Sequence, residues 1–139
     1  MTTIPPIGRE AIEFARRGDF EQAIATARRA VGEHPDDFGL RVFLAMLHVR
    51  RAEIADAVPH LRAAMAIDPA DHFPRLELVR VLIGLGDLDE ASALLDQVHL
   101  PGAEPLRLRA MLLQRRSETA DAAELYRRLV TTDPPDFQS

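Results

Sequence analysis

Cysteine, tryptophan, lysine and asparagine are all absent from this chain of 139 residues. Without cysteine the protein can form neither a disulfide nor a thiolate metal site, and the redox compartment is left open. The missing lysine and cysteine also exclude Schiff-base and thiol chemistry. All 17 cationic residues are therefore arginine. Because lysine and asparagine have AT-rich codons, this usage points to a GC-rich bacterial genome.

The sequence also lacks the usual signatures of catalysis. None of Ser92, Ser117 and Ser139 lies in a nucleophile-elbow phrase, and Gly84-Leu85-Gly86 is too short for a phosphate loop. The histidines lie far apart, without the spacing of a zinc site: His34, His48, His60, His72 and His99. We therefore predict no catalytic residue, no cofactor, no metal and no enzymatic activity.

Charge and hydropathy limit the partners. A formal net charge of −5 argues against binding to a phosphate backbone. The segment 1–6 has no cationic region followed by an apolar stretch, so it does not read as a secretory signal. The longest apolar run, residues 76–85, contains Arg80 and is too short to span a bilayer. We expect a cytoplasmic protein that binds neither nucleic acid nor membrane.

Apolar residues recur at helical spacing along the chain, and no segment alternates with the period of two that is typical of a strand. Hydrophobic residues make up 47% of the chain, which favours an ordered core. Proline, glycine and aspartate mark the helix ends. The pattern predicts helices over residues 7–17, 20–31, 37–50, 55–67, 73–85, 88–98, 105–116 and 119–131. Asp19, Asp56 and Asp87 are the expected caps of three of them.

One phrase recurs along the sequence. Gly18-Asp19-Phe20-Glu21-Gln22-Ala23 returns 68 residues later at 86–91, and a weaker copy at 52–57 lies midway, which gives a period of 34. The last unit is in phase after a deletion of three residues, because Ala91 to Ala122 and Leu95 to Tyr126 are both 31 apart. The chain is therefore expected to consist of four similar units, at about 4–37, 38–71, 72–102 and 103–136.

These columns resemble the tetratricopeptide repeat family. The family's small residue in the first helix falls on Ala11, Ala45, Val79 and Ala110, and that of the second helix on Ala23, Ala57, Ala91 and Ala122. Its first-helix aromatic falls on Phe14 but on His48 in the second unit, where a packed, hydrogen-bonded histidine is expected. The resemblance implies one all-α domain over 1–139, a right-handed α-solenoid of antiparallel helix hairpins (a superhelix).

In this family the first helices line a concave groove. The resemblance places twelve residues there, as an apolar floor with arginine along it: Ile12, Arg16, Val42, Met46, Val49, Arg50, Leu76, Arg80, Ile83, Arg107, Met111 and Arg115. The floor could instead be covered by the ends of the chain or by another copy. Some family members hold a C-terminal carboxylate with two asparagines. Ile12 and Met46 occupy those positions here, so that function is not expected.

The resemblance implies a non-catalytic scaffold that binds a protein or peptide segment in its groove. Two alternatives stay open. The chain could be the N-terminal repeat module of a longer bacterial enzyme such as a transferase, because residues 133–137 read like the start of another unit. It could also be a self-associating structural protein. The apolar stripe of the helix predicted at 119–131 indicates a homodimer through that helix.

Overall fold

The computed structural model describes residues 4–131, without the side chains of residues 122, 125 and 129–131. This part of the chain forms seven α-helices and contains no strand. The helices are α1 (Pro6–Arg16), α2 (Phe20–Glu33), α3 (Phe38–Arg50), α4 (Ile54–Ile67), α5 (Phe73–Leu85), α6 (Leu88–Asp96) and α7 (Ala103–Thr131). The all-α prediction is confirmed.

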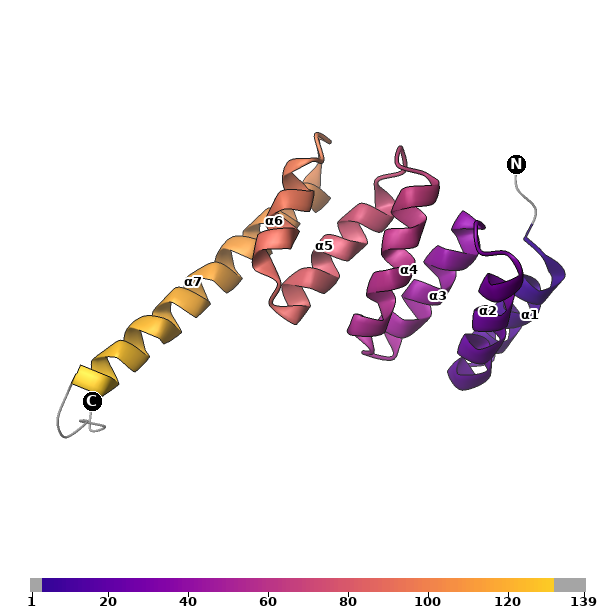
Figure 1. The fold of residues 1–139 in the computed structure, drawn as a ribbon, viewed down its shortest axis with the longest axis horizontal. Helices are drawn as coiled ribbons and strands as arrows, with labels where there is room; N and C mark the ends of the chain where they lie inside the picture. The colour runs from indigo at the N-terminus through magenta and orange to yellow at the C-terminus, as the bar shows by residue number, and fades with distance from the viewer. Residues whose placement is uncertain (1–3, 132–139) are drawn as a thin grey trace.

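The helices stack side by side as a solenoid (Figure 1). Three antiparallel hairpins, α1–α2, α3–α4 and α5–α6, follow one another, and the second helix of each contacts the first helix of the next. α7 packs on both α5 and α6. Since a single hairpin cannot bury its apolar face alone, this stacking creates the continuous core.

The same turn closes all three hairpins. One residue in each turn has a left-handed backbone, with φ of 79° at Gly18, 61° at Ala52 and 84° at Gly86. The next amide then donates to a carbonyl five residues back, at 2.9 Å in each case: Asp19 to Phe14, Glu53 to His48, and Asp87 to Leu82. This is the hydrogen bond of a Schellman motif, which satisfies a free carbonyl at the helix end.

Ala52 is the only one of the three turn residues that carries a Cβ, and it is the only non-glycine with positive φ in the described chain. A left-handed backbone costs an alanine about 1 kcal/mol relative to glycine. We therefore expect Ala52→Gly to raise the free energy of unfolding by about 0.5–1 kcal/mol, measured by urea titration. The matched change Ala93→Gly, at an exposed position inside α6, should lower it by a similar amount. A loss of stability in Ala52→Gly would contradict the strain at this turn.

The small-residue columns pack as the sequence predicts in the first three units. Ala11, Ala45 and Val79 of the first helices are fully buried. So are their counterparts in the second helices: Ala23, Ala57 and Ala91. Small side chains at these positions let the two helix axes of a hairpin approach closely.

The fourth hairpin does not form. The prediction of two helices, 105–116 and 119–131, is wrong, because α7 runs unbroken from Ala103 to Thr131. The turn position falls on Ser117, which lacks the conformational freedom of Gly18 and Gly86. Inside the uninterrupted helix, the Thr119 hydroxyl donates to the Arg115 carbonyl at 2.9 Å. With no helix folded back over it, Ala110 is exposed. The side chain of Ala122 lies outside the described residues.

Two of the three aspartates expected to cap a helix do not form a side-chain capping bond. Asp19 accepts a hydrogen bond from the Gln22 amide at 3.4 Å, as predicted. Asp56 is not a cap, because α4 begins at Ile54 and Asp56 lies in its first turn. Asp87 lies at the N-cap of α6 but makes no side-chain capping bond.

The buried residues form two clusters with no residue in common. One joins α1, α2 and part of α3, and includes Ala27, Leu40 and Leu44. The other joins the rest of α3 to α4, α5, α6 and α7, and includes Leu61 and Leu78. None of the described helices combines the length and apolar character needed to cross a membrane.

Candidate binding groove

A hollow of about 420 Å³ opens where α3, α5 and α7, the first helices of their units, come together. We call it the groove. Its walls are mostly apolar, with charged groups at the edges. The residues that line it are Val49, Ile54, Glu77, Arg80, Val81, Ile83, Gly84, Met111, Gln114, Arg115 and Glu118. It has the size and the apolar character of a typical ligand site in proteins.

Five of the twelve residues expected to bind a partner meet in the groove: Val49, Arg80, Ile83, Met111 and Arg115. Val49 and Met111 are half-buried and pack against the core beneath them. Ile83 is only 2% exposed, so it forms the floor and offers little surface to a partner.

The other seven do not line this hollow. Ile12, Val42, Met46 and Leu76 are half-buried on α1, α3 and α5. The three arginines are exposed and already have contacts of their own. Arg16 lies 3.5 Å from the Glu13 carboxylate, Arg107 donates to Glu104 at 2.9 Å, and the Arg50 guanidinium lies 5.2 Å from the centre of the Phe20 ring. The expected stripe is therefore divided, and this hollow is lined by five of its residues.

The two arginines that line the groove differ in whether they pair with a carboxylate. Arg80 pairs with both Glu77 and Glu104, so its charge is offset. Glu77 is only 9% exposed, which makes Arg80 the group that compensates a nearly buried carboxylate. Arg115 is half-buried and pairs with no carboxylate among the described residues. Of the two, Arg115 is the cation that a bound acidic group could neutralise.

Sequence reasoning missed Glu77, Glu118, Ile54, Val81 and Gly84. The two carboxylates lie three positions from Arg80 and Arg115, and this spacing puts charges side by side on a helix, so it could have revealed them. Ile54 belongs to a second helix, outside the family's groove positions. A Cβ on Gly84 would lie 3.1 Å from the Ile54 Cδ1, so the glycine admits this side chain.

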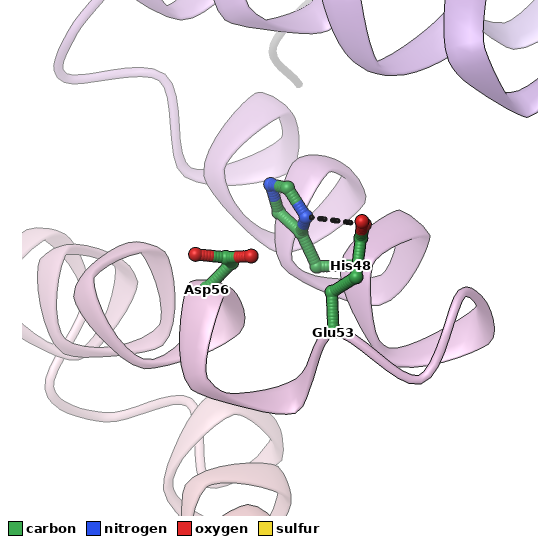
Figure 2. Close-up of side chains that lie close together, drawn as sticks. All are labelled: His48, Glu53 and Asp56. Atoms are coloured by element: carbon green, nitrogen blue, oxygen red, sulfur yellow. Dashed lines mark hydrogen bonds and ion pairs between the residues drawn. The ribbon is translucent and has the colours of Figure 1, made fainter.

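A polar cluster lies at the turn between α3 and α4 (Figure 2). His48 is 2% exposed, and its Nδ1 lies 3.3 Å from a Glu53 carboxylate oxygen. This confirms the packed, hydrogen-bonded histidine. His60 stacks on His48 with ring centroids 6.0 Å apart. Burial, followed by the charge of Arg41, lowers the pKa of His60 and so favours the neutral ring.

Potential ligand atoms of His48, Glu53 and Asp56 lie within 4.8 Å of one another, a set that could in principle hold a cation. A second, smaller hollow, separate from the groove, is lined by this cluster together with Arg28 and Arg51, and the Arg51 Nε lies 3.9 Å from the Glu53 carboxylate. Their positive charge opposes a divalent ion at this place. We therefore assign the cluster a structural role in the turn.

Two sequence profiles, both described as tetratricopeptide repeat, match residues 9–72 and 51–115. The chain belongs to the tetratricopeptide repeat family. No curated relative matches it. Similar solved structures include the second repeat domain of human RPAP3 in complex with the HSP70 peptide SGPTIEEVD, with 20% identity and a TM-score of 0.66 over 79% of this chain and 92% of that one.

Another similar structure is a mutant O-GlcNAc transferase of Thermobaculum terrenum, with 26% identity and a TM-score of 0.57. The match covers 79% of this chain but only 21% of the transferase. The tetratricopeptide repeat fold described here therefore corresponds to about a fifth of that enzyme.

Proposed function

We propose that this tetratricopeptide repeat protein is a non-catalytic scaffold that holds a segment of a protein partner in the groove. The observation that carries the proposal is the apolar hollow of about 420 Å³ between three first helices. The repeat domain of RPAP3, which has a similar fold, is in complex with a peptide. We further propose that the protein acts in the cytoplasm.

The lining of the groove indicates the chemistry of the partner. Val49, Ile54 and Met111 offer an apolar surface, and buried apolar anchors dominate such interfaces. Arg115 lies beside them with no carboxylate partner among the described residues, and arginine is suited to carboxylates. We propose a segment with one or two apolar anchors next to an aspartate or glutamate. The charge pair would set register and association rate, so binding should weaken with salt.

A displayed library of random peptides, selected against the purified protein, tests this function. Enriched peptides should share an apolar anchor followed or preceded by an acidic residue. The variant Arg115→Glu should bind an enriched peptide at least tenfold more weakly in fluorescence polarisation, because attraction becomes repulsion. The control Arg29→Glu changes the same charge on the exposed surface of α2, away from the groove, and should bind as wild type does. Equal binding by both variants would remove the groove as the site.

A second candidate function rests on the likeness to the transferase. The chain would then be the repeat module of a longer bacterial enzyme and would present substrates or partners to a catalytic domain. Sequencing the gene beyond codon 139 checks this. A catalytic domain in the same reading frame would support the module, and an immediate stop codon would remove this candidate.

A further inference from the structure

Tyr126 is the most exposed large apolar side chain in the described part of the chain, at 70%. It lies in the second half of α7, which extends past α5 and α6 with no helix beside it (Figure 1). The equivalent residues of the three hairpins are fully buried: Ala27, Leu61 and Leu95. The second half of α7 therefore leaves uncovered a position that the other repeats bury.

Tyr126 lies on the side of α7 that lines the groove. At about 3.6 residues per turn, Met111, Arg115 and Tyr126 fall within about 60° of one another around the helix axis. Glu118, which also lines the groove, lies about two turns before Tyr126. The groove therefore continues along α7 to Tyr126 as one surface. We call this surface the α7 face, and its residues are Met111, Arg115, Glu118, Thr119 and Tyr126.

We infer that the partner segment is an amphipathic α-helix that lies along the α7 face from Met111 to Tyr126. The inference rests on the proposed function, because it names the form of the segment that the groove holds. Met111 and Tyr126 are about 22 Å apart along α7, so the partner helix needs about four turns. A second copy of this chain on the same face would fill the groove of both copies, so we assign the face to a different protein.

The backbone of α7 favours a helix over an extended segment as its neighbour. α7 is one continuous helix, so its interior amides and carbonyls pair with one another and offer no hydrogen bond to a neighbour. An extended segment pressed against it would have unpaired backbone groups on the covered side, which is costly. An α-helix pairs these groups internally and packs only side chains against Tyr126.

The charges of the α7 face indicate the sequence of the partner helix. Arg115 pairs with no carboxylate among the described residues. Glu118, about one turn further along the helix, is exposed and accepts a hydrogen bond from Gln114 at 3.3 Å. A complementary helix carries an acidic residue opposite Arg115 and a basic residue about one turn away, opposite Glu118. Apolar residues near its two ends would contact Met111 and Tyr126.

A selection of displayed random peptides of about 18 residues, or about five turns of helix, supplies the probe. An enriched peptide should gain helical circular dichroism when it is mixed with the protein. Tyr126→Ala should weaken the binding of this peptide at least tenfold in fluorescence polarisation, because an apolar anchor is lost. The control Leu113→Ala should bind as wild type does, since Leu113 is 63% exposed on nearly the opposite side of the same helix.

Arg115→Glu separates this inference from the proposed function. If Arg115→Glu weakens binding and Tyr126→Ala does not, the groove is the site but the partner helix does not extend along the α7 face, and the inference is wrong. If neither variant weakens binding, or if no peptide is enriched, the inference and the proposed function are both wrong. A bound peptide that stays extended would also overturn the inference.

Sedimentation equilibrium tests a second copy as the occupant of the α7 face. The unmodified chain and Tyr126→Ala should have the same mass at high protein concentration, because no second copy covers Tyr126. A dimer of the unmodified chain that Tyr126→Ala dissociates would mean that a second copy covers this face, and it would overturn the proposal.

Discussion

Replacing Leu78 by alanine is expected to lower the free energy of unfolding by about 2–5 kcal/mol. Leu78 is fully buried in α5 and belongs to the cluster that joins α3 to α7. The substitution removes apolar contacts and leaves a cavity that close-packed neighbours cannot fill completely. α5 contacts α4, α6 and α7, and the cluster that contains Leu78 includes residues of all these helices.

Urea unfolding followed by far-ultraviolet circular dichroism measures this effect. Leu85→Ala is the matched control, since Leu85 lies on the same helix but is 45% exposed, and its loss should cost about 1 kcal/mol or less. Equal losses in the two variants would mean that the stack does not depend on the core around Leu78.

The second large effect is expected at Arg80. Replacing Arg80 by glutamate should lower the free energy of unfolding by about 2–3 kcal/mol. Arg80 pairs with Glu77, which is 9% exposed, and with Glu104. The variant leaves a nearly buried carboxylate without its cation and adds a third negative charge beside it. The pair is partly open to solvent, so the loss should stay below that of a fully buried ion pair.

Arg109→Glu provides the control for Arg80→Glu. Arg109 pairs with Asp96 at 3.2 Å, but both side chains are exposed, so the same reversal of charge should cost about 1 kcal/mol or less. Thermal unfolding of the two variants at low salt compares them. If Arg80→Glu melts like wild type, Glu77 does not depend on Arg80 for its stability in the fold.

The period of 34 residues was sufficient to predict the three hairpins, because small residues and turn glycines repeat with it and each has a direct steric meaning. Ala52 kept the period without a glycine, and its turn formed with a left-handed backbone. Ser117 kept the period as well, and its turn did not form. The sequence pattern alone did not distinguish these two non-glycine residues. Whether such a turn forms depends on whether packing of the next helix offsets the free-energy cost of the left-handed backbone.

The sequence predicted which side of the solenoid carries the groove, but not how the charged side chains pair within it. The resemblance to the repeat family placed Val49, Arg80 and Met111 on the concave side of the solenoid, and all three line the groove. The pairing of Arg80 with Glu104 could not be deduced, because Glu104 lies in another helix and the side-chain geometry decides the contact. For the same reason, the division of charge between Arg80 and Arg115 emerged only from the structure.

The two separate core clusters have a mechanical consequence. α3 contributes Leu40, Leu44 and Leu47 to one cluster and Ala45 to the other, and it is the boundary between them. Tension applied along the solenoid would therefore separate α1 and α2 from the remaining helices before it disrupted the core around α5. The protein would therefore extend in steps. In the first step α1 and α2 would separate, and α3 would stay with the remaining helices.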